Sequence, residues 1–281
     1  MKDLSQWIGR SQSISDVVTQ SGVDRFCATI NCPSSSVNNS KVAPHGYHWC
    51  LGLPDSLTSE LGEDGHPMKG GFLPPVELPR RMWASSKVEF VQALPIGATI
   101  KRNSRIASVV EKSGKTGKLV FVGVDHETQV ESEVAIREQQ TIVYREATKT
   151  STPLPDDNAE QPKDWQIVES LIPSPQLLFR YSALTFNSHR IHYDLPYTQA
   201  EELYAGLIVH GPLMATLILQ LAAKHGDVAK FSFRGMSPAY CNQSLYLTAN
   251  FKQSSDLHSG ELATIGGDGR TCLSAQLEFR A

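Results

Sequence analysis

The alternation of apolar and polar residues predicts two successive sets of antiparallel strands. In the first half of the chain, strands are predicted at 86–90, 99–111, 119–126 and 134–145. The glycine- and lysine-rich segment 112–118 lies between two of them and predicts a hairpin turn. A phosphate-binding loop is the poorer interpretation of this segment, because no helix follows it.

The second half of the chain repeats this order around a helix. The segment from Gly211 to about His225 is the most apolar in the protein and predicts a buried helix. A long apolar helix followed by antiparallel strands is an α+β pattern, in which the sheet wraps around the helix. Strands are predicted before and after this helix at 165–173, 229–234, 245–249, 262–265 and 273–279.

The remaining segments give weaker patterns. Residues 3–30 are predicted to be helical, with an N-cap at Ser13 or Ser15. Residues 177–182 and 190–193 are predicted to be extended, and 195–206 to form a helix. Residues 44–83 are rich in proline and glycine and carry aromatic side chains, so they form either the wall or lid of a pocket or a flap over a core.

A polar, proline-containing segment just past the middle of the chain predicts two domains. We place the first domain at 1–148, a linker at 149–163, and the second domain at 164–281. The helical and strand patterns in both parts give the same α+β class. The alternating strand–helix order and the glycine fingerprint of a dinucleotide-binding fold do not occur.

Composition and charge narrow the class of protein. The 281 residues are 40% hydrophobic and 20% charged, with a net charge of −3, which is typical of a soluble globular protein. This charge gives no reason to expect nucleic acid or an anionic membrane as a partner. The longest apolar run, 213–223, is too short to span a bilayer, and the first residues lack an apolar signal core, so we expect a cytoplasmic protein. The five scattered cysteines predict reduced thiols.

The segment 186–194 concentrates polar groups of the kind that carry out acid–base chemistry. His192 is the candidate general base, and Asn187 is a candidate for orienting a water molecule. Asp194 precedes a predicted helix and suits the role of its N-cap.

A metal site formed by residues of the two polar turns is an alternative to this interpretation. Its candidate ligands are His189, His192, Asp194 and His210. It is the weaker alternative, because His189 and His192 would share a face only on a helix. We therefore expect no metal.

A second polar turn opens the apolar helix. His210 and Gly211 lie at its start, where backbone N–H groups are free and the helix dipole is positive. Such donors bind a polarised carbonyl oxygen. Gly206 adds a flexible backbone position four residues before His210. A base, an orienting amide and these donors together suit addition of water to a polarised C=C bond.

These residues resemble a known family. The run Asn187-Ser188-His189-Arg190-Ile191-His192-Tyr193-Asp194 looks like the active-site motif of the MaoC-like, R-specific enoyl-CoA hydratases, which have the hotdog fold. The run 207–213 resembles the start of that family's central helix, and 78–83 resembles a stretch of the degenerate N-terminal hotdog of its double-hotdog branch. In one departure, Asn187 stands where the family usually has the aspartate that shares the water with the histidine.

The resemblance implies an acyl-CoA hydratase or dehydratase with two hotdog domains, the first of which has lost its own catalytic residues. The implied substrate is a C5-dicarboxylic acyl-CoA such as itaconyl-CoA or mesaconyl-C4-CoA, hydrated to citramalyl-CoA in itaconate breakdown. Coenzyme A is then part of the substrate, no separate cofactor is needed, and a homodimer is expected. The candidates for binding are Arg80, Arg81 and Arg190 for the substrate carboxylate and Arg234 for the CoA phosphates. The alternative for each of these arginines is an ion pair with an acidic residue.

Two alternatives remain open. One is a 3-hydroxyacyl-thioester dehydratase of fatty-acid synthesis. The other is an acyl-CoA-binding protein without catalytic activity, which the missing aspartate would explain.

Overall fold

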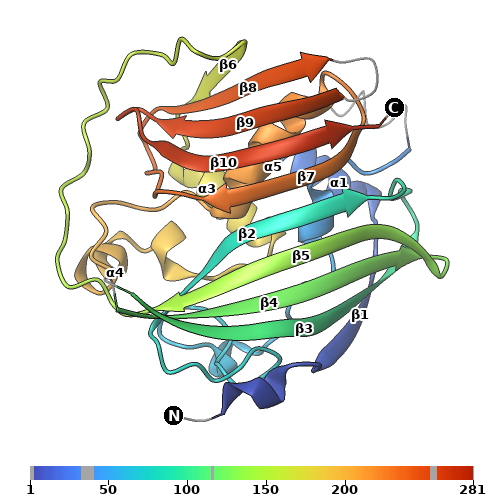
Figure 1. Ribbon diagram of the computed structural model, residues 1–281, viewed down its shortest axis with the longest axis horizontal. Helices are drawn as coiled ribbons and strands as arrows, with labels where there is room; N and C mark the ends of the chain where they lie inside the picture. Colours follow the sequence, from blue (N-terminus) through green and yellow to red (C-terminus); the bar gives the residue numbers. More distant parts are fainter. Residues whose placement is uncertain (1–2, 33–40, 115–116, 254–257, 281) are drawn as a thin grey trace.

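A single antiparallel sheet forms the frame of the protein. The computed structural model describes residues 3–32, 41–114, 117–253 and 258–280. Within these ranges ten strands hydrogen-bond in the order β1-β3-β4-β5-β2-β7-β10-β9-β8-β6 (Figure 1). The strands are β1 (Ser11–Val17), β2 (Arg80–Phe90), β3 (Thr99–Gly114), β4 (Gly117–Val130), β5 (Glu133–Arg145), β6 (Ile167–Leu171), β7 (Val228–Gly235), β8 (Leu245–Gln253), β9 (His258–Gly266) and β10 (Thr271–Phe279).

The two halves of the chain have the same strand order. β1-β3-β4-β5-β2 of the first half corresponds to β6-β8-β9-β10-β7 of the second. The halves join where β2 pairs with β7, from Ser85 opposite Arg234 to Glu89 opposite Lys230. Residues 146–166, which contain the predicted linker, connect β5 to β6 without a helix or strand. This is the double-hotdog arrangement that the resemblance implied.

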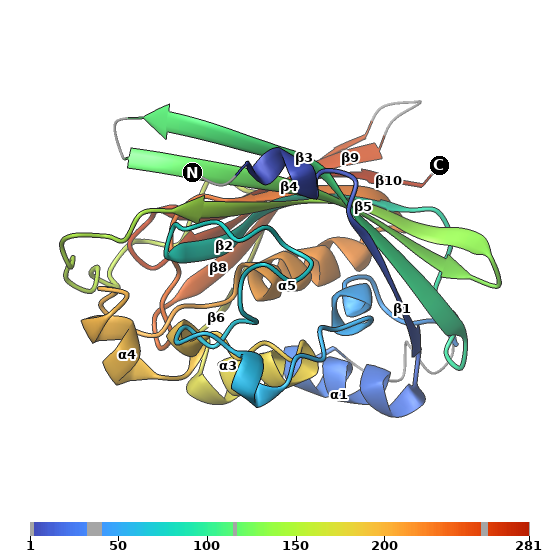
Figure 2. The same ribbon diagram turned by 90° about the horizontal axis from the view of Figure 1, so that it is seen from below.

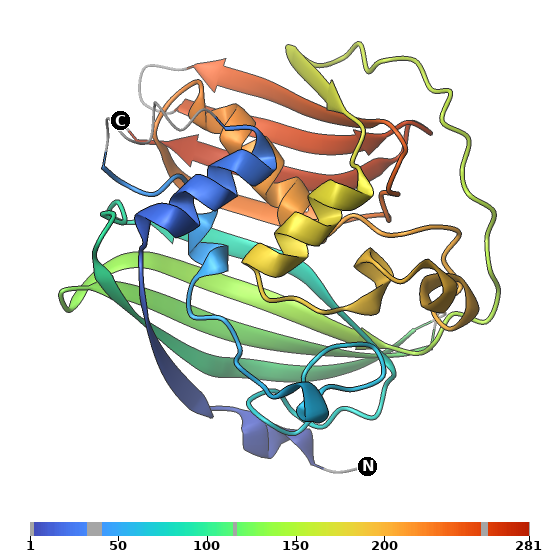
Figure 3. The ribbon, with the colours of Figure 1, turned by 180° about the vertical axis from the view of Figure 1, so that it is seen from behind.

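The helices lie together on one face of the sheet (Figures 2 and 3). They are α1 (Gln20–Ile30), α3 (Pro175–Leu184), α4 (Leu195–Ala200) and α5 (Gly211–Ala223). The 3-10 turns are η1 (Leu4–Trp7), η2 (Tyr47–Cys50), η3 (Thr58–Glu60) and η4 (Arg190–His192), and η1 lies apart from the helices, against β3. No helix among the described residues is long and apolar enough to cross a membrane.

The buried helix α5 is the centre of the core. It packs against β2 and against β7 to β10, and its residues Leu213, Ile218 and Leu219 have no exposed surface. Each such side chain contributes roughly 1.5–3 kcal/mol by leaving water. A helix that is apolar on every side needs partners on every side. The burial of α5 therefore fixes the position of its N-terminus, where His210 and Gly211 lie.

The predicted strands and the predicted apolar helix are confirmed, with ends that differ by a few residues. The predicted hairpin at 112–118 is confirmed by the pairing of β3 with β4 up to Gly114 and Gly117; its tip, residues 115–116, lies outside the described residues.

The prediction of one helical segment at 3–30 was wrong. The segment contains η1, the strand β1 and the helix α1, and the N-cap of α1 is Thr19 rather than Ser13 or Ser15. β1 is mostly exposed and pairs with β3 along its whole length. β1 is therefore a strand because it hydrogen-bonds to β3. Its own alternation of apolar residues is too weak to predict a strand.

Three predictions around the polar turn were also wrong. Residues 177–182 belong to the helix α3, whose N-cap Ser174 accepts a hydrogen bond from the Leu177 N–H. Residues 190–192 form a 3-10 turn rather than an extended segment. The helix after Asp194 ends at Ala200 instead of Gly206. The predicted N-cap at Asp194 is confirmed, because its side chain accepts from the Tyr197 N–H.

Candidate active site

A large cavity is lined by both halves of the chain. Its volume is about 1870 Å³. The second half contributes His192 and His210, and the proline- and glycine-rich segment of the first half contributes Trp49, His66 and Trp83 among others. Of the two interpretations of that segment, the pocket wall is therefore the one that the structure shows.

His192 is held in the orientation of a general base. Its Nδ1 lies 2.7 Å from the carbonyl oxygen of Ile208, which can only accept, so Nδ1 carries the proton. In the neutral ring the other nitrogen, Nε2, is then free to accept a proton. Ile208 itself is fixed by a hydrogen bond from its N–H to the Ile191 carbonyl, at 2.9 Å. The short turn η4 and the segment before α5 thus set the tautomer of His192.

His210 lies directly against His192. Their rings are stacked, with centroids 3.5 Å apart and an angle of 19° between the planes. The Nε2 of His210 is 2.8 Å from the Ser182 hydroxyl of α3, and its Nδ1 is buried without a partner among the described residues. Two imidazoles at this distance cannot both be charged. His210 therefore supports a neutral His192.

Burial keeps both rings neutral. It lowers the pKa of His192 well below its ordinary value, and the neighbouring His210 and His189 lower it further. Burial likewise lowers the pKa of His210 to about 3. Near pH 7 the site therefore contains a neutral imidazole that can accept a proton from water.

The buried histidines predict acid lability. Six of the nine histidines have a lowered pKa because of burial, at positions 45, 48, 66, 126, 192 and 210. Below pH ~6.5 the unfolded chain binds protons that the folded protein does not, so stability decreases as the pH falls. Melting temperatures from circular dichroism should be constant from pH 8 to 7 and fall between pH 6.5 and 4.5.

Two variants separate this effect from general acid sensitivity. His126→Gln should make the melting temperature less dependent on pH, because burial lowers the pKa of His126 to about 3. His258→Gln, at an exposed position, should leave the dependence unchanged. A melting temperature that is equal or higher at pH 4.5 would contradict the prediction.

Asn187 organises the turn that leads to His192. The side-chain oxygen of Asn187 accepts a hydrogen bond from the backbone N–H of His189 at 3.0 Å. The backbone N–H of Asn187 donates to the Ser182 carbonyl at 2.9 Å. The carboxamide oxygen is therefore already used within the turn. The NH₂ group remains as the part of Asn187 that can donate into the cavity, which Asn187 lines.

A loop from the first half of the chain is docked on this turn. In the loop 61–67, the carbonyl oxygens of Glu63, Asp64 and Gly65 accept hydrogen bonds from Arg190 and Ser188. Gly65 has φ +85°, and a Cβ at this position would lie 1.9 Å from the Ser188 oxygen. Only glycine fits this contact. The two halves of the chain therefore meet at the predicted active-site motif.

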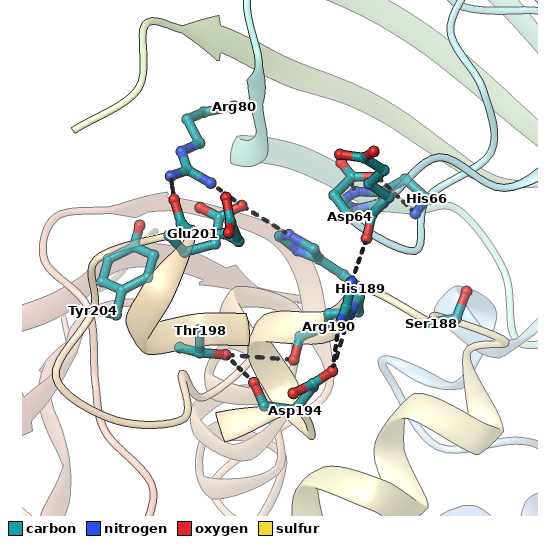
Figure 4. A network of polar contacts seen from close by, with 12 residues as sticks. Asp64, His66, Arg80, Ser188, His189, Arg190, Asp194, Thr198, Glu201 and Tyr204 are labelled. Carbon is teal, nitrogen blue, oxygen red and sulfur yellow. Dashed lines mark hydrogen bonds and ion pairs between the residues drawn. The ribbon is translucent and has the colours of Figure 1, made fainter. Parts of the chain in front are cut away.

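The docked loop brings polar side chains to His189 (Figure 4). Asp64 Oδ2 is 2.9 Å from His66 Nδ1, and the His66 ring lies 4.1 Å from the His189 ring. His189 in turn contacts His192, at 5.5 Å between centroids, and its Nε2 is 3.9 Å from Glu202. This network connects the first half of the chain to the candidate base.

Within the described part of the chain, Asp64, His66 and His189 are the group whose spacing could suit a metal ion. Their ligand atoms lie within 4.8 Å of one another. His192, Asp194 and His210 of the alternative metal site are not in this group. The hydrogen bond between Asp64 and His66 accounts for their closeness. The expectation of no metal remains a prediction.

The structure separates the three arginines proposed for a substrate carboxylate. Arg190 pairs with Asp194 at 2.7 Å and lies over the Tyr197 ring, and Arg80 pairs with Glu202. Arg81 lines the cavity and donates to the neutral carbonyl of Pro67, at 3.3 Å.

The other predicted residues lie in different surroundings. Gly211 begins α5, lines the cavity and has its N–H in the first turn, where no partner exists within the helix. Gly206 lies against Leu154 and Tyr240, outside the cavity lining. Arg234 is exposed on β7, opposite Ser85 of β2.

Sequence reasoning missed Ser182, Asp64, His66 and Glu202. Ser182 could have been placed on a helix, because Ser174-Pro175 is a helix-start signal and Leu177, Leu178, Tyr181 and Leu184 follow at helical spacing. For the other three no signal exists in the sequence, because their role depends on which loop docks on which.

Comparison with known proteins identifies the family. The family model for hydroxyacyl-thioester dehydratase type 2 matches residues 46–241. The mesaconyl-C(4)-CoA hydratase of Chloroflexus aurantiacus is 40% identical over 279 residues, which cover 99% of this chain and 98% of that protein. The chain belongs to the hydroxyacyl-thioester dehydratase type 2 family. A second family member, the mitochondrial hydroxyacyl-thioester dehydratase type 2 of Schizosaccharomyces pombe, is 26% identical and covers 83% of this chain and 87% of its own length.

Solved structures confirm the fold. A MaoC-like dehydratase superposes with a TM-score of 0.76 at 13% identity and covers 99% of both chains. A Mycobacterium tuberculosis protein described as having a double hotdog fold superposes with a TM-score of 0.62 at 11% identity, covering 96% of this chain and 95% of that one. The predicted resemblance to MaoC-like enzymes and the predicted double hotdog are both confirmed.

Proposed function

We propose that this member of the hydroxyacyl-thioester dehydratase type 2 family catalyses the reversible addition of water to an α,β-unsaturated acyl-CoA. The observation that carries the proposal is the neutral His192, oriented by the Ile208 carbonyl in the same cavity as the N-terminus of α5. The 40% identity to a mesaconyl-C(4)-CoA hydratase supports it.

The proposed reaction uses these groups in order. Nε2 of His192 takes a proton from water while the water oxygen bonds to the β-carbon. The electron pair of the double bond moves toward the thioester, and the Gly211 N–H at the start of α5 binds the carbonyl oxygen as its charge grows. The imidazolium then returns a proton to the α-carbon. One molecule of water is added, and His192 is regenerated.

The test is a direct assay with purified protein. Mesaconyl-C4-CoA, itaconyl-CoA and crotonyl-CoA are each mixed with the protein, and loss of the enoyl absorbance is followed with product identification by mass spectrometry. We expect hydration of at least one of them. No turnover of any of the three would refute the proposed hydration of a short acyl-CoA and leave the long-chain dehydratase and the acyl-CoA-binding alternatives.

We further propose that the substrate is a C5-dicarboxylic acyl-CoA, mesaconyl-C4-CoA or itaconyl-CoA, converted to citramalyl-CoA in itaconate breakdown. The activity named for the 40% identical relative supports this choice. The alternative, a 3-hydroxyacyl-thioester dehydratase of fatty-acid synthesis, is favoured by the name of the family model. A preference for long 3-hydroxyacyl thioesters over any C5 diacid would decide for the alternative.

Replacing Asn187 should slow catalysis less than removing the base. We expect Asn187→Ala to lower kcat with crotonyl-CoA by about 10²- to 10³-fold, by analogy with the loss of an orienting donor. The comparison is Asn187→Asp, which keeps an oxygen for the His189 N–H but loses the NH₂ group. Wild-type kcat in Asn187→Ala would show that the donor is not needed. Activity of Asn187→Asp would not show this, because aspartate is the residue that the family usually has here and can itself share the water with His192.

Three further expectations complete the proposal. Coenzyme A enters as part of the substrate without another cofactor, and Arg234 contacts its phosphates. The protein is a homodimer, which light scattering during size-exclusion chromatography would test. It acts in the cytoplasm.

A further inference from the structure

The arginines that line the cavity differ in what they contact. Arg80 and Arg270 pair with carboxylates, and the charge of Glu138 acts on the buried Arg102. Arg145 donates to the Tyr204 hydroxyl at 3.1 Å, close to the linker.

Arg81 is the arginine of this set that lies beside the docked loop, and in the described part of the chain it hydrogen-bonds to neutral groups. It is half-buried, donates to the Pro67 carbonyl and lies near the Tyr144 hydroxyl. Among the described residues, no carboxylate forms an ion pair with Arg81.

A second cation lies close to Arg81. Lys69, also half-buried, donates to the Leu78 carbonyl and lies 5.9 Å from the centre of the Tyr144 ring. Burial lowers the pKa of Lys69; the charge of Asp64 raises it, and the charge of Arg81 lowers it again. Two half-buried cations near each other raise the energy of the free protein unless an anion joins them.

The carboxylates nearby are already bound to other groups. Asp64 is hydrogen-bonded to His66 at 2.9 Å, Glu202 pairs with Arg80, and Asp194 pairs with Arg190. In the part of the chain that the structure describes, neither Arg81 nor Lys69 has a carboxylate within ion-pair distance. The charge of Asp64 acts on Lys69 without an ion pair, so both cations remain available to an anionic group of a ligand.

This pair of cations lies on the side of the cavity that leads to the base. The charge of Arg81 acts on His66, whose ring lies 4.1 Å from His189, and His189 contacts His192. All four side chains of Lys69, Arg81, His66 and His192 line the same cavity. If an acyl group whose reacting carbons lie at His192 extends along the docked loop, its other end points toward Arg81 and Lys69.

We propose that Arg81 and Lys69 form the subsite for the free carboxylate of a dicarboxylic acyl-CoA. The inference rests on the proposed hydratase function. Arg81 binds the carboxylate bidentately, which its planar guanidinium permits, and Lys69 adds a second charge. The same positive charge makes a metal ion at the neighbouring Asp64 and His66 unfavourable.

The test is the substrate preference of an Arg81→Gln variant. With mesaconyl-C4-CoA, kcat/KM should fall by about 10²-fold, the order expected for a charge-assisted bidentate contact. With crotonyl-CoA, which has no free carboxylate, kcat/KM should change less than about threefold.

Two further variants test the charges separately. Lys69→Gln should lower kcat/KM for mesaconyl-C4-CoA by about tenfold. Arg81→Lys should lose less than Arg81→Gln, because it keeps the charge. Arg137→Gln, at an exposed arginine paired with Glu89, is the matched control.

Other results would overturn the subsite. Equal losses with both CoA esters, but none with their N-acetylcysteamine thioesters, would assign Arg81 to a CoA phosphate. Unchanged kinetics with all substrates in a variant whose circular dichroism is native would show that Arg81 binds no substrate group. A wild-type protein that hydrates crotonyl-CoA but neither mesaconyl-C4-CoA nor itaconyl-CoA would also refute the subsite, while leaving the hydratase function standing. A wild-type protein without any turnover would refute the proposed function itself.

Discussion

Changing His192 to alanine should lower kcat for hydration by about 10²- to 10⁴-fold, the contribution expected of a general base. The reason is that Nε2 of His192 is the proton acceptor left free by the hydrogen bond from Nδ1 to the Ile208 carbonyl. The measurement is loss of enoyl absorbance under saturating acyl-CoA. The affinity for the CoA ester, measured by isothermal titration calorimetry, should change much less.

The control for this substitution is His258→Ala, which changes an exposed histidine at the start of β9. It should retain wild-type kinetics. Turnover that survives in His192→Ala at more than a tenth of the wild-type rate would transfer the role of base to another group, with His66 and His189 the next to be changed. Loss of the native circular dichroism would make His192→Gln the variant to measure.

Changing Gly65 to alanine should disconnect the docked loop from the motif. The added Cβ would overlap the Ser188 oxygen at 1.9 Å, and φ +85° is unfavourable for alanine. The loop must move away, which displaces Asp64 and His66 from His189 and loosens η4. We expect kcat/KM to fall by about 10²-fold, because a displacement of about 1 Å has this effect in a catalytic site.

The matched control lies in the same segment. A Cβ added to Gly71 would have nothing within 4 Å, and Gly71 has no positive φ, so Gly71→Ala should be neutral. The far-UV circular dichroism of both variants should remain native, since neither glycine lies in a strand or helix. Wild-type kinetics in Gly65→Ala would mean that the docked loop does not support the active site.

The proposed dicarboxylic substrate gives a reason for the departure at Asn187. In its observed position the carboxamide oxygen holds the His189 N–H and the turn that places His192. An aspartate could accept the same bond, but it would bring a negative charge into a cavity where we propose that a substrate carboxylate binds. Like charges in one cavity repel, whereas the NH₂ group of an amide does not repel a carboxylate. The amide therefore suits a dicarboxylic substrate.

The sequence by itself determined the architecture and singled out His192 as the candidate base. The strands and α5 follow from residue spacing, because a buried face imposes a period of two on a strand, and a helix buried on all sides must be apolar throughout. Asp194 was recognised as a cap because capping depends on neighbours in sequence. His192 stood out because it lies within a dense polar turn that resembles a known motif.

Only the tertiary structure decided how the two halves cooperate. The stacking of His210 on His192, the bond from Ser182, and the docking of 61–67 on Ser188 and Arg190 join residues far apart in the chain. Likewise, the pairing of Arg80 with Glu202 and of Arg190 with Asp194 is what leaves Arg81 as the candidate for a carboxylate. Local sequence patterns report periodicity and capping. They do not indicate which loops pack together or which charged side chains form ion pairs, because both depend on distances between residues that are set only when the chain folds.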